Sequence, residues 1–287
     1  MLGRCIGRDP RLYTHFAPRV VPDCDTFWLM PRINNSDKDW ERFGKTDPYF
    51  AVLTAPEFHG RLSDTERAKF FQSGEDHIEA ILSIVRDRFD PAFAPARALD
   101  FGCGVGRLLL PLAQRCREVT GVDVSPSMLA EARHNCDAAG ARNVRLVQSD
   151  DDLSALDGEF DFVHSYIVLQ HIPVERGEKI VRKLASKLAA GGVGMFHVPY
   201  TDGRKRLSSR ALYWLRMNVP GGKMALNLLR GRNPAAPVMQ MNEYSVTRLL
   251  DILWGEGCGE VVVRFSDHSG ARGVLLFAHK ASVPIFT

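Results

Sequence analysis

The sequence lacks the features that mark three common classes of protein. Its six cysteines are scattered, with no C-x-x-C pair and no histidines at the spacing of metal ligands. No apolar run is long enough to span a membrane, and the first residues, MLGRCIGRDPRLY, contain no apolar core of a signal peptide. These absences predict reduced thiols, no disulfide framework, no metal site, no membrane span and a cytoplasmic location.

A strong excess of one charge is also missing. The formal net charge is only +3, which by itself does not indicate a nucleic-acid partner. The 287 residues are 45% hydrophobic and 25% charged, an ordinary composition for a globular protein. This length suffices for one large domain with additions, and it leaves the oligomeric state open.

The most informative stretch is ALDFGCGVGRLLLPLA, from Ala98 to Ala113. It predicts a strand that ends near Asp100, a tight turn and the start of a helix, with glycines at Gly102, Gly104 and Gly106. Glycines in such a turn let the backbone approach a ligand closely. The G-x-G-x-x-G pattern of dinucleotide-binding turns does not fit, because its third glycine falls on Arg107 or on Leu109. A nicotinamide cofactor is therefore disfavoured.

Strands alternate with helices along most of the chain. A capping box at Ser63 and Glu66 predicts the start of a helix over 63–89. Strands are predicted near 96–101, 118–123, 143–148, 160–168, 193–199, 260–265 and 273–280, with helices over 125–140, 173–192 and 245–254 between them. The short loop SDHSGAR permits only an antiparallel pairing of the last two strands. The rhythm predicts an α/β fold with a doubly wound, mostly parallel, seven-stranded sheet.

Two segments lie outside this rhythm. Residues 1–62 are predicted to be an irregular N-terminal extension, which leaves the main domain at 63–287. An insert over 201–242 carries eight basic residues against Asp202, namely Arg204, Lys205, Arg206, Arg210, Arg216, Lys223, Arg230 and Arg232. We interpret it as a helical lid. Its basic face is either simply solvated, or it recognises an acidic or phosphorylated acceptor, a membrane surface or nucleic acid.

Four motifs resemble those of the class I S-adenosylmethionine (SAM)-dependent methyltransferases. ALDFGCGVGR, VTGVDVSPSML, VQSDDD and FDFVHSYIVLQHI occur in the order and spacing of that family, within a resemblance that covers about 96–280. The resemblance implies a Rossmann-like domain at 63–287 with an antiparallel last strand. It also implies SAM as cofactor, S-adenosylhomocysteine (SAH) as its product and methyl transfer as the activity.

The resemblance places the cofactor at the strand ends. Asp123 ends the second strand, where its carboxylate would accept hydrogen bonds from both ribose hydroxyls. Asp150 would face the adenine amino group, with Asp151 as the alternative in the same acidic turn. The other implied cofactor-binding residues lie along the glycine turn, the adenosine and the sulfonium: Asp100, Gly102, Cys103, Gly104, Gly106, Val124, Met128, Ser165 and Gln170.

Candidate catalytic residues are two histidines. His171 is the stronger candidate for a general base, because the unperturbed pKa of histidine lies near neutrality. The alternative is that His171 only orients a loop or lines the pocket. His197 is the weaker candidate, and a core position is its alternative. The candidate acceptor-binding residues are aromatic, and core packing explains them equally well: Trp40, Tyr49, Phe50, Tyr166 and Tyr200.

The acceptor is constrained only by what the fourth strand lacks. No N/D-P-P-Y signature follows it, which argues against the methyltransferases that act on DNA bases and glutamine. The leading hypothesis is O-methylation of a small molecule or sugar, which the basic insert would suit if the acceptor is acidic. A SAM-binding module without catalysis, an N-methyltransferase of a small molecule or RNA, and a dehydrogenase stay open as alternatives.

Overall fold

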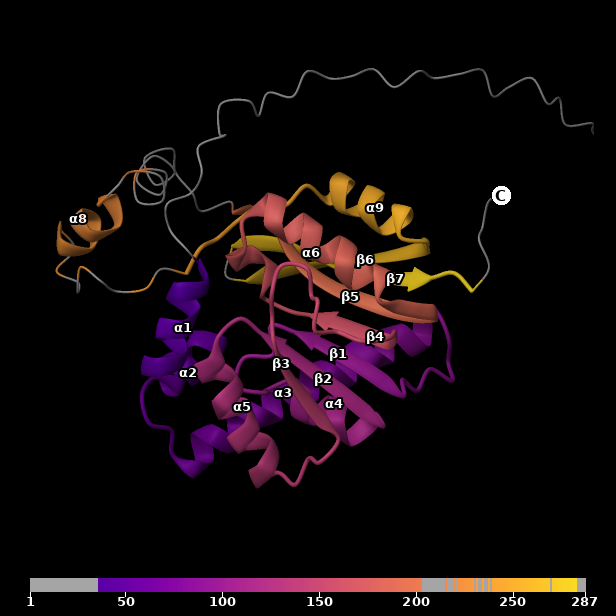
Figure 1. Cartoon of the computed structure of the whole chain (residues 1–287), viewed down its shortest axis with the longest axis horizontal. Coiled ribbons are helices and arrows are strands. Elements are labelled where there is room, and N and C mark those ends of the chain that lie inside the picture. The colour runs from indigo at the N-terminus through magenta and orange to yellow at the C-terminus, as the bar shows by residue number, and fades with distance from the viewer. Residues whose placement is uncertain are drawn as a thin grey trace, which may run out of the picture. The chain divides into compact units, whose positions relative to one another are not determined.

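A seven-stranded sheet forms the centre of the fold (Figure 1). The computed structural model describes residues 36–202, 221–229, 239–268 and 270–282, and positions 215, 219, 231, 234 and 237. The strand order is β3-β2-β1-β4-β5-β7-β6, and β7 is antiparallel to both of its neighbours. The predicted α/β fold is confirmed. The strands are β1 Arg97–Phe101, β2 Glu118–Asp123, β3 Val144–Gln148, β4 Phe160–Ser165, β5 Leu188–Asp202, β6 Cys258–His268 and β7 Ala271–Lys280.

Helices cover both faces of this sheet because its strands are apolar on both sides. Successive residues of β1 point to opposite faces, so that Leu99 joins one core cluster and Ala98 joins the other. One face packs against α6 (Val174–Ser186) and α9 (Val246–Gly255), which lie next to each other in Figure 1. The other face packs against α3 (Asp64–Arg88), α4 (Leu109–Arg115) and α5 (Pro126–Ala138).

The helix starts follow the local sequence signals. Ser63 and Glu66 form the predicted capping box of α3. The Ser125 hydroxyl caps α5, and Pro126 occupies its first turn. The Ser245 hydroxyl accepts a hydrogen bond from the third residue of α9 in the same way. The predicted capping box of α3 is confirmed, because capping depends on neighbours within one helical turn.

The boundaries around β4 and β5 differ from the prediction. The helix expected to continue to Gly191 and Gly192 ends at Ser186, and β5 already begins at Leu188. A register shift of β4 against β5 and the positive φ of Gly191, 78°, accommodate this early start. The fourth strand ends at Ser165 rather than at residue 168, since Ile167 has a φ of 60°, outside the β region.

Residues 36–58 are helical, so the prediction of an irregular segment is wrong for this part of the chain. They form α1 (Ser36–Thr46), α2 (Pro48–Val52) and a 3₁₀ turn (Pro56–Phe58). These helices are too short to give a sustained periodicity in the sequence. Their aromatic side chains pack against Phe70 of α3 and Met128 of α5. Residues 1–35 lie outside the described part, and the domain boundary at 62/63 stays a prediction.

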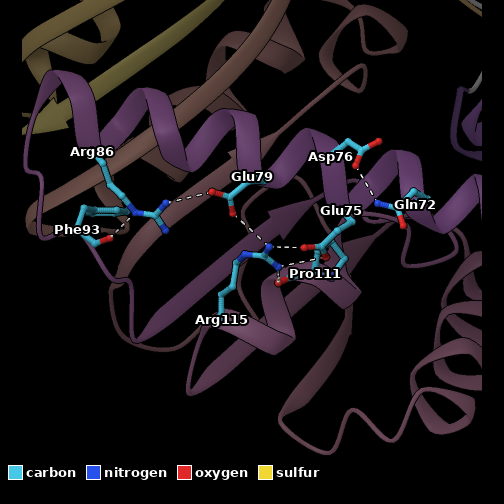
Figure 2. A network of polar contacts seen from close by, with 8 residues as sticks. All are labelled: Gln72, Glu75, Asp76, Glu79, Arg86, Phe93, Pro111 and Arg115. Carbon is cyan, nitrogen blue, oxygen red and sulfur yellow. Dashed lines mark hydrogen bonds and ion pairs between the residues drawn. The ribbon is translucent and has the colours of Figure 1, made fainter.

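Polar side chains join α3 to α4 on the outside of the fold (Figure 2). Arg115 of α4 forms ion pairs with Glu75 and Glu79 of α3, and its contact with Glu79 is 3.3 Å. Arg86 donates to Glu79 at 3.4 Å, which extends the same network along α3. Each partly exposed pair adds little stability. Together they restrain the orientation of α3 relative to the segment that follows the glycine turn.

The predicted lid is described only in part. Helix α8 (Gly222–Leu229) confirms helical structure within 201–242. Lys223 at its start forms an ion pair of 2.5 Å with Asp39 of α1. The seven arginine and lysine residues of the insert other than Lys223 lie outside the described residues. In the described part of the chain, no helix combines the length and the apolar character needed to cross a membrane.

Candidate functional site

The glycine turn leads from the carboxyl end of β1 into α4 and is hydrogen-bonded to the carboxyl end of the neighbouring strand β2. Gly102 and Gly104 have positive φ angles of 76° and 52°, which side chains rarely adopt. A Cβ atom on Gly102 would overlap with the Val168 side chain. The N–H groups of Gly102 and Cys103 both donate to the Val122 carbonyl, at 2.7 and 3.0 Å. The sequence therefore places a bare stretch of backbone at the point where a ligand binds in open α/β sheets.

Asp123 at the end of β2 holds this turn in place. Its Oδ2 accepts from the Gly104 N–H at 2.9 Å, and its Oδ1 accepts from the Ser125 N–H at 2.9 Å. Burial raises the pKa of the carboxyl group to about 6, although these hydrogen bonds act in the opposite direction. Asp123 thus fixes the turn and also presents its carboxylate to the cavity beside it.

A cavity opens over the turn and over the loop after β4. Helices α1 and α2 contribute Trp40 and Val52 to its wall, and α6 contributes Arg176. The Arg176 guanidinium bonds to Asp37 of α1 at 2.6 and 3.0 Å and to Asp151 at 2.6 Å. The cavity brings together the following residues predicted from the sequence: Trp40, Asp100, Gly102, Cys103, Asp123, Val124, Tyr166 and His171.

Asp100 is a buried acid with one oxygen left without a partner. Its Oδ1 accepts from Nδ1 of His164, on the neighbouring strand β4, at 2.9 Å. Nε2 of His164 lies 3.2 Å from Nε2 of His77 on α3. Burial lowers the pKa of His77 to about 2, which keeps that ring neutral. Oδ2 of Asp100 has no hydrogen-bond partner among the described residues, so this acceptor remains for a donor in the cavity.

His171 lies in the 3₁₀ turn after β4 (Leu169–His171), with both ring nitrogens engaged. Its Nδ1 donates to the Gln240 carbonyl at 2.6 Å, so Nδ1 carries the proton. Its Nε2 lies 3.2 Å from the amide nitrogen of Gln170 and accepts from it. Burial lowers the pKa of His171 to about 4, and Trp40 covers the ring at 4.9 Å. The residue is neutral, and its role as a general base stays a prediction.

The segment just before α9 fixes the loop that carries His171. The hydroxyl of Tyr244 lies 2.8 Å from the Leu169 carbonyl and 2.9 Å from the Ile172 carbonyl. Asn242 donates to the Gln170 carbonyl with its backbone N–H at 2.7 Å and with its side chain at 3.0 Å. The loop is thus preorganised by residues about seventy positions further along the chain.

Several predicted cofactor-binding residues lie outside the cavity wall. Asp150 is exposed, and its carboxylate caps the following turn by accepting from Ser154. Ser149 lines the cavity in its place. The acidic turn therefore does not present Asp150 to the cavity, because the local cap satisfies this carboxylate. Asp151 binds Arg176. The remaining predicted cofactor-binding residues are buried or lie behind the cavity wall: Gly104, Gly106, Met128, Ser165 and Gln170.

Three predicted acceptor-binding aromatics and His197 also lie outside the wall. Tyr49 is buried, and its hydroxyl donates to Glu131 at 2.5 Å and accepts from Arg67 at 2.7 Å. This places Tyr49 in the core that joins α2 to α5, away from the cavity. Phe50 packs on a neighbouring histidine, and Tyr200 packs on Phe265. His197 is buried, with Nε2 3.0 Å from the Ser266 hydroxyl.

Sequence reasoning missed Arg107, His164, His77 and Arg176. Two of them carried a signal, since Arg107 interrupts an apolar run and His164 is a titratable residue within a buried strand. His77 and Arg176 look like ordinary helix-surface residues in the sequence. Only the packing of α3 and α6 on the sheet brings them to the site.

Comparison with known proteins identifies the central part of the chain. Residues 98–192 match the family model of a methyltransferase domain. This chain is 38% identical to a ubiquinone biosynthesis O-methyltransferase of Xanthomonas axonopodis pv. citri (strain 306) over 112 residues, which are 39% of this chain. Residues 98–192 therefore carry the sequence of a methyltransferase domain, and the fold agrees with that of solved methyltransferases.

Further relatives of this methyltransferase domain agree in fold. A magnesium-protoporphyrin O-methyltransferase of Synechocystis sp. is 38% identical over 87 residues, which are 30% of this chain and 38% of the relative. The superposition on the crystal structure of magnesium protoporphyrin IX methyltransferase from Synechocystis PCC 6803 with bound SAH covers 86% of this chain and 100% of that chain. Its TM-score is 0.57 and the sequence identity is 19%. The chain spans less than half the length of the two curated relatives, 45% and 38%.

Proposed function

We propose that this protein is a SAM-dependent methyltransferase that acts on an oxygen of a small-molecule acceptor. The observation that carries the proposal is the glycine turn with Asp100 and Asp123 beside one cavity. The domain family and the folds of solved methyltransferases support it. The names of the two curated relatives, both O-methyltransferases, support oxygen as the methylated atom.

The residues at the turn fit SAM. Val168 occupies the place that a Cβ of Gly102 would take, so only glycine lets the turn pack against the loop after β4 at the edge of the cavity. We infer that Asp123 binds the ribose hydroxyls and that the free Oδ2 of Asp100 accepts from the ammonium group of the methionine end. When bound, SAM supplies an electrophilic methyl group on a positively charged sulfur. The chain's own contribution is to bind, to orient and to exclude water, for which Trp40 covers one side of the cavity.

Asp123→Ala is expected to weaken SAH binding about tenfold or more, which corresponds to about 1.4 kcal/mol for a charged hydrogen bond. The variant removes the carboxylate from the cavity and also releases the Gly104 N–H that it accepts from. Titration calorimetry of the purified protein with SAH measures the effect. Asp150→Ala is the matched control, because Asp150 is exposed and outside the cavity wall.

Transfer is tested in the same proteins with methyl-labelled SAM and a small-molecule extract. We expect labelled product and SAH with the wild type and with Asp150→Ala, and little of either with Asp123→Ala. Unchanged SAH affinity in Asp123→Ala would reject the ribose assignment. If the wild type bound SAH but labelled no metabolite, a binding module without catalysis would replace the proposed enzyme.

His171→Gln is expected to lower turnover about a hundredfold if His171 is the base, the lower end of the usual contribution of such a group. SAH affinity should stay within about twofold, since the predicted role concerns the acceptor. Because the pKa of His171 is about 4, its protonation should not reduce turnover between pH 8 and pH 6. Rates from the labelled-SAM assay measure both effects, with the exposed His134→Gln as control. Full activity of His171→Gln would leave alignment alone as the source of catalysis.

A further inference from the structure

Arg107 is a buried cation without a counter-charge. The residue follows the last glycine of the turn and is only 5% exposed. Among the described residues, its guanidinium has one hydrogen bond, to the Ser73 hydroxyl at 3.2 Å, and its Nε has no partner. No carboxylate of the described part lies within 4.0 Å of it. Asp100 is close enough to interact electrostatically with Arg107 but does not contact it, so the guanidinium keeps donors for an anion in the cavity.

The guanidinium belongs to the cavity wall on the β4 side. Tyr166 lies on the same wall, and its ring packs on His77 at 4.0 Å and near His197 at 5.1 Å. His268 extends this group at 6.0 Å from Tyr166. The Nδ1 of His197 and the Nε2 of His268 are buried without a hydrogen-bond partner in the described part. We call Arg107 and Tyr166, which both line the cavity, the basic wall, and the three histidines lie behind it.

The position of the basic wall in the sheet points to the acceptor rather than to the cofactor. Asp123 stands at β2 and Asp100 at β1, and these two carboxylates mark the cofactor side. Arg107 follows the glycine turn, while Tyr166 on the same cavity wall comes directly after β4 and is backed by His77 of α3, His197 of β5 and His268 of β6. Asp100 is already bonded to His164 and forms no ion pair with Arg107. The basic wall therefore presents one fixed positive charge and hydrogen-bonding groups to whatever lies beyond the methyl donor.

We propose that the basic wall is the acceptor subsite and that Arg107 binds a carboxylate carried by the acceptor. A guanidinium holds a carboxylate through two parallel N–H···O bonds, and the Tyr166 hydroxyl can donate a third. This explains why Arg107 is buried at a cavity wall with only a serine as partner. The inference rests on the proposed function.

The test uses the full chain saturated with SAH and two probes of equal shape, benzoate and benzamide, at matched ionic strength. We expect benzoate to raise the unfolding temperature by a few degrees and benzamide to have no effect. Arg107→Gln should abolish the benzoate response and leave the dissociation constant of SAH within about twofold. Arg145→Gln, an exposed arginine on β3, is the matched control. Should Arg107→Gln fold poorly, Arg107→Lys retains the charge without the planar fork and should weaken the benzoate response at least fivefold.

Two results would overturn the inference. The first is an equal response of the wild type to benzoate and benzamide. The second is SAH binding that falls tenfold or more in Arg107→Gln while the binding of 5′-methylthioadenosine, which lacks the amino-acid end, is unchanged. In that case Arg107 binds the carboxylate of the cofactor. Failure of the wild type to bind SAH would instead reject the proposed function, so the two failures are distinguishable.

Discussion

Gly74→Ala is expected to lower the free energy of unfolding by about 2–3 kcal/mol, because it forces a side chain into a backbone contact. Gly74 lies in the middle of α3, directly against the residue that follows the glycine turn. A Cβ there would overlap with the carbonyl oxygen of Arg107 and lie 3.0 Å from the carbonyl carbon. These are backbone atoms, so α3 or the turn itself has to move. Alanine is the better helix former by about 1 kcal/mol, but this gain is smaller than the overlap penalty.

Urea unfolding of the two proteins measures the difference. Gly255→Ala at the end of α9 is the matched control, because its nearest neighbour would be Arg182 at 3.9 Å, an ordinary contact. The control should stay within about 0.5 kcal/mol of the wild type. SAH affinity should also fall in Gly74→Ala, since the displaced carbonyl adjoins the turn. Wild-type stability of Gly74→Ala would mean that α3 can move away without cost, which its ion pairs with Arg115 oppose.

The features that could be predicted from the sequence depend on neighbours along the chain. The glycine turn follows from three alternate glycines after an apolar strand, and Ser63 and Ser125 cap helices with groups one turn away. The antiparallel β7 follows from a loop too short for a crossover. The position of Asp100 and Asp123 at the cavity could also be predicted, because both residues end parallel strands and the carboxyl ends of such strands meet at one edge of a sheet.

The features that escaped prediction depend on tertiary packing. His77 reaches His164 only because α3 crosses behind β4, and no pattern within either segment records that contact. Tyr49 looked like an acceptor contact, but its hydroxyl has partners 82 and 86 positions away on α5. Asp150 illustrates the limit of a motif, since the acidic turn was found while its cap on Ser154 was not. Motifs locate a site, and packing decides which side chains enter it.

The second large effect is expected from acid. The net free energy of unfolding should fall by about 4–5 kcal/mol between pH 7 and pH 5, from linked protonation of buried histidines. Burial lowers the pKa of His77 to about 2, that of His197 to about 3 and that of His171 to about 4. Below a pH of about 6.5, the unfolded chain protonates these rings and the folded protein does not. Stability is therefore lost as the pH falls from about 6.5 toward these folded-state values, by about 2 kcal/mol per histidine at pH 5.

Asp123 acts in the opposite direction. Its folded-state pKa is about 6, above the unfolded value of 3.8, so the folded protein takes up this proton first as the pH falls. That proton uptake adds about 1.4 kcal/mol to the free energy of unfolding between pH 7 and pH 5, which offsets most of the loss caused by one histidine. The three histidines outweigh the single carboxyl group. The net expectation is thus a protein that is less stable in weak acid, even though its acidic cofactor residue alone would favour the lower pH.

Urea titrations at pH 7 and pH 5 measure this loss. His197→Asn, whose amide can still bond to Ser266, should reduce the loss by about 1–2 kcal/mol because one protonation is removed from the unfolded side. His134→Asn is the matched control, since His134 is exposed on α5 and should leave the loss unchanged. Equal stability of the wild type at both pH values would show that water reaches the buried rings.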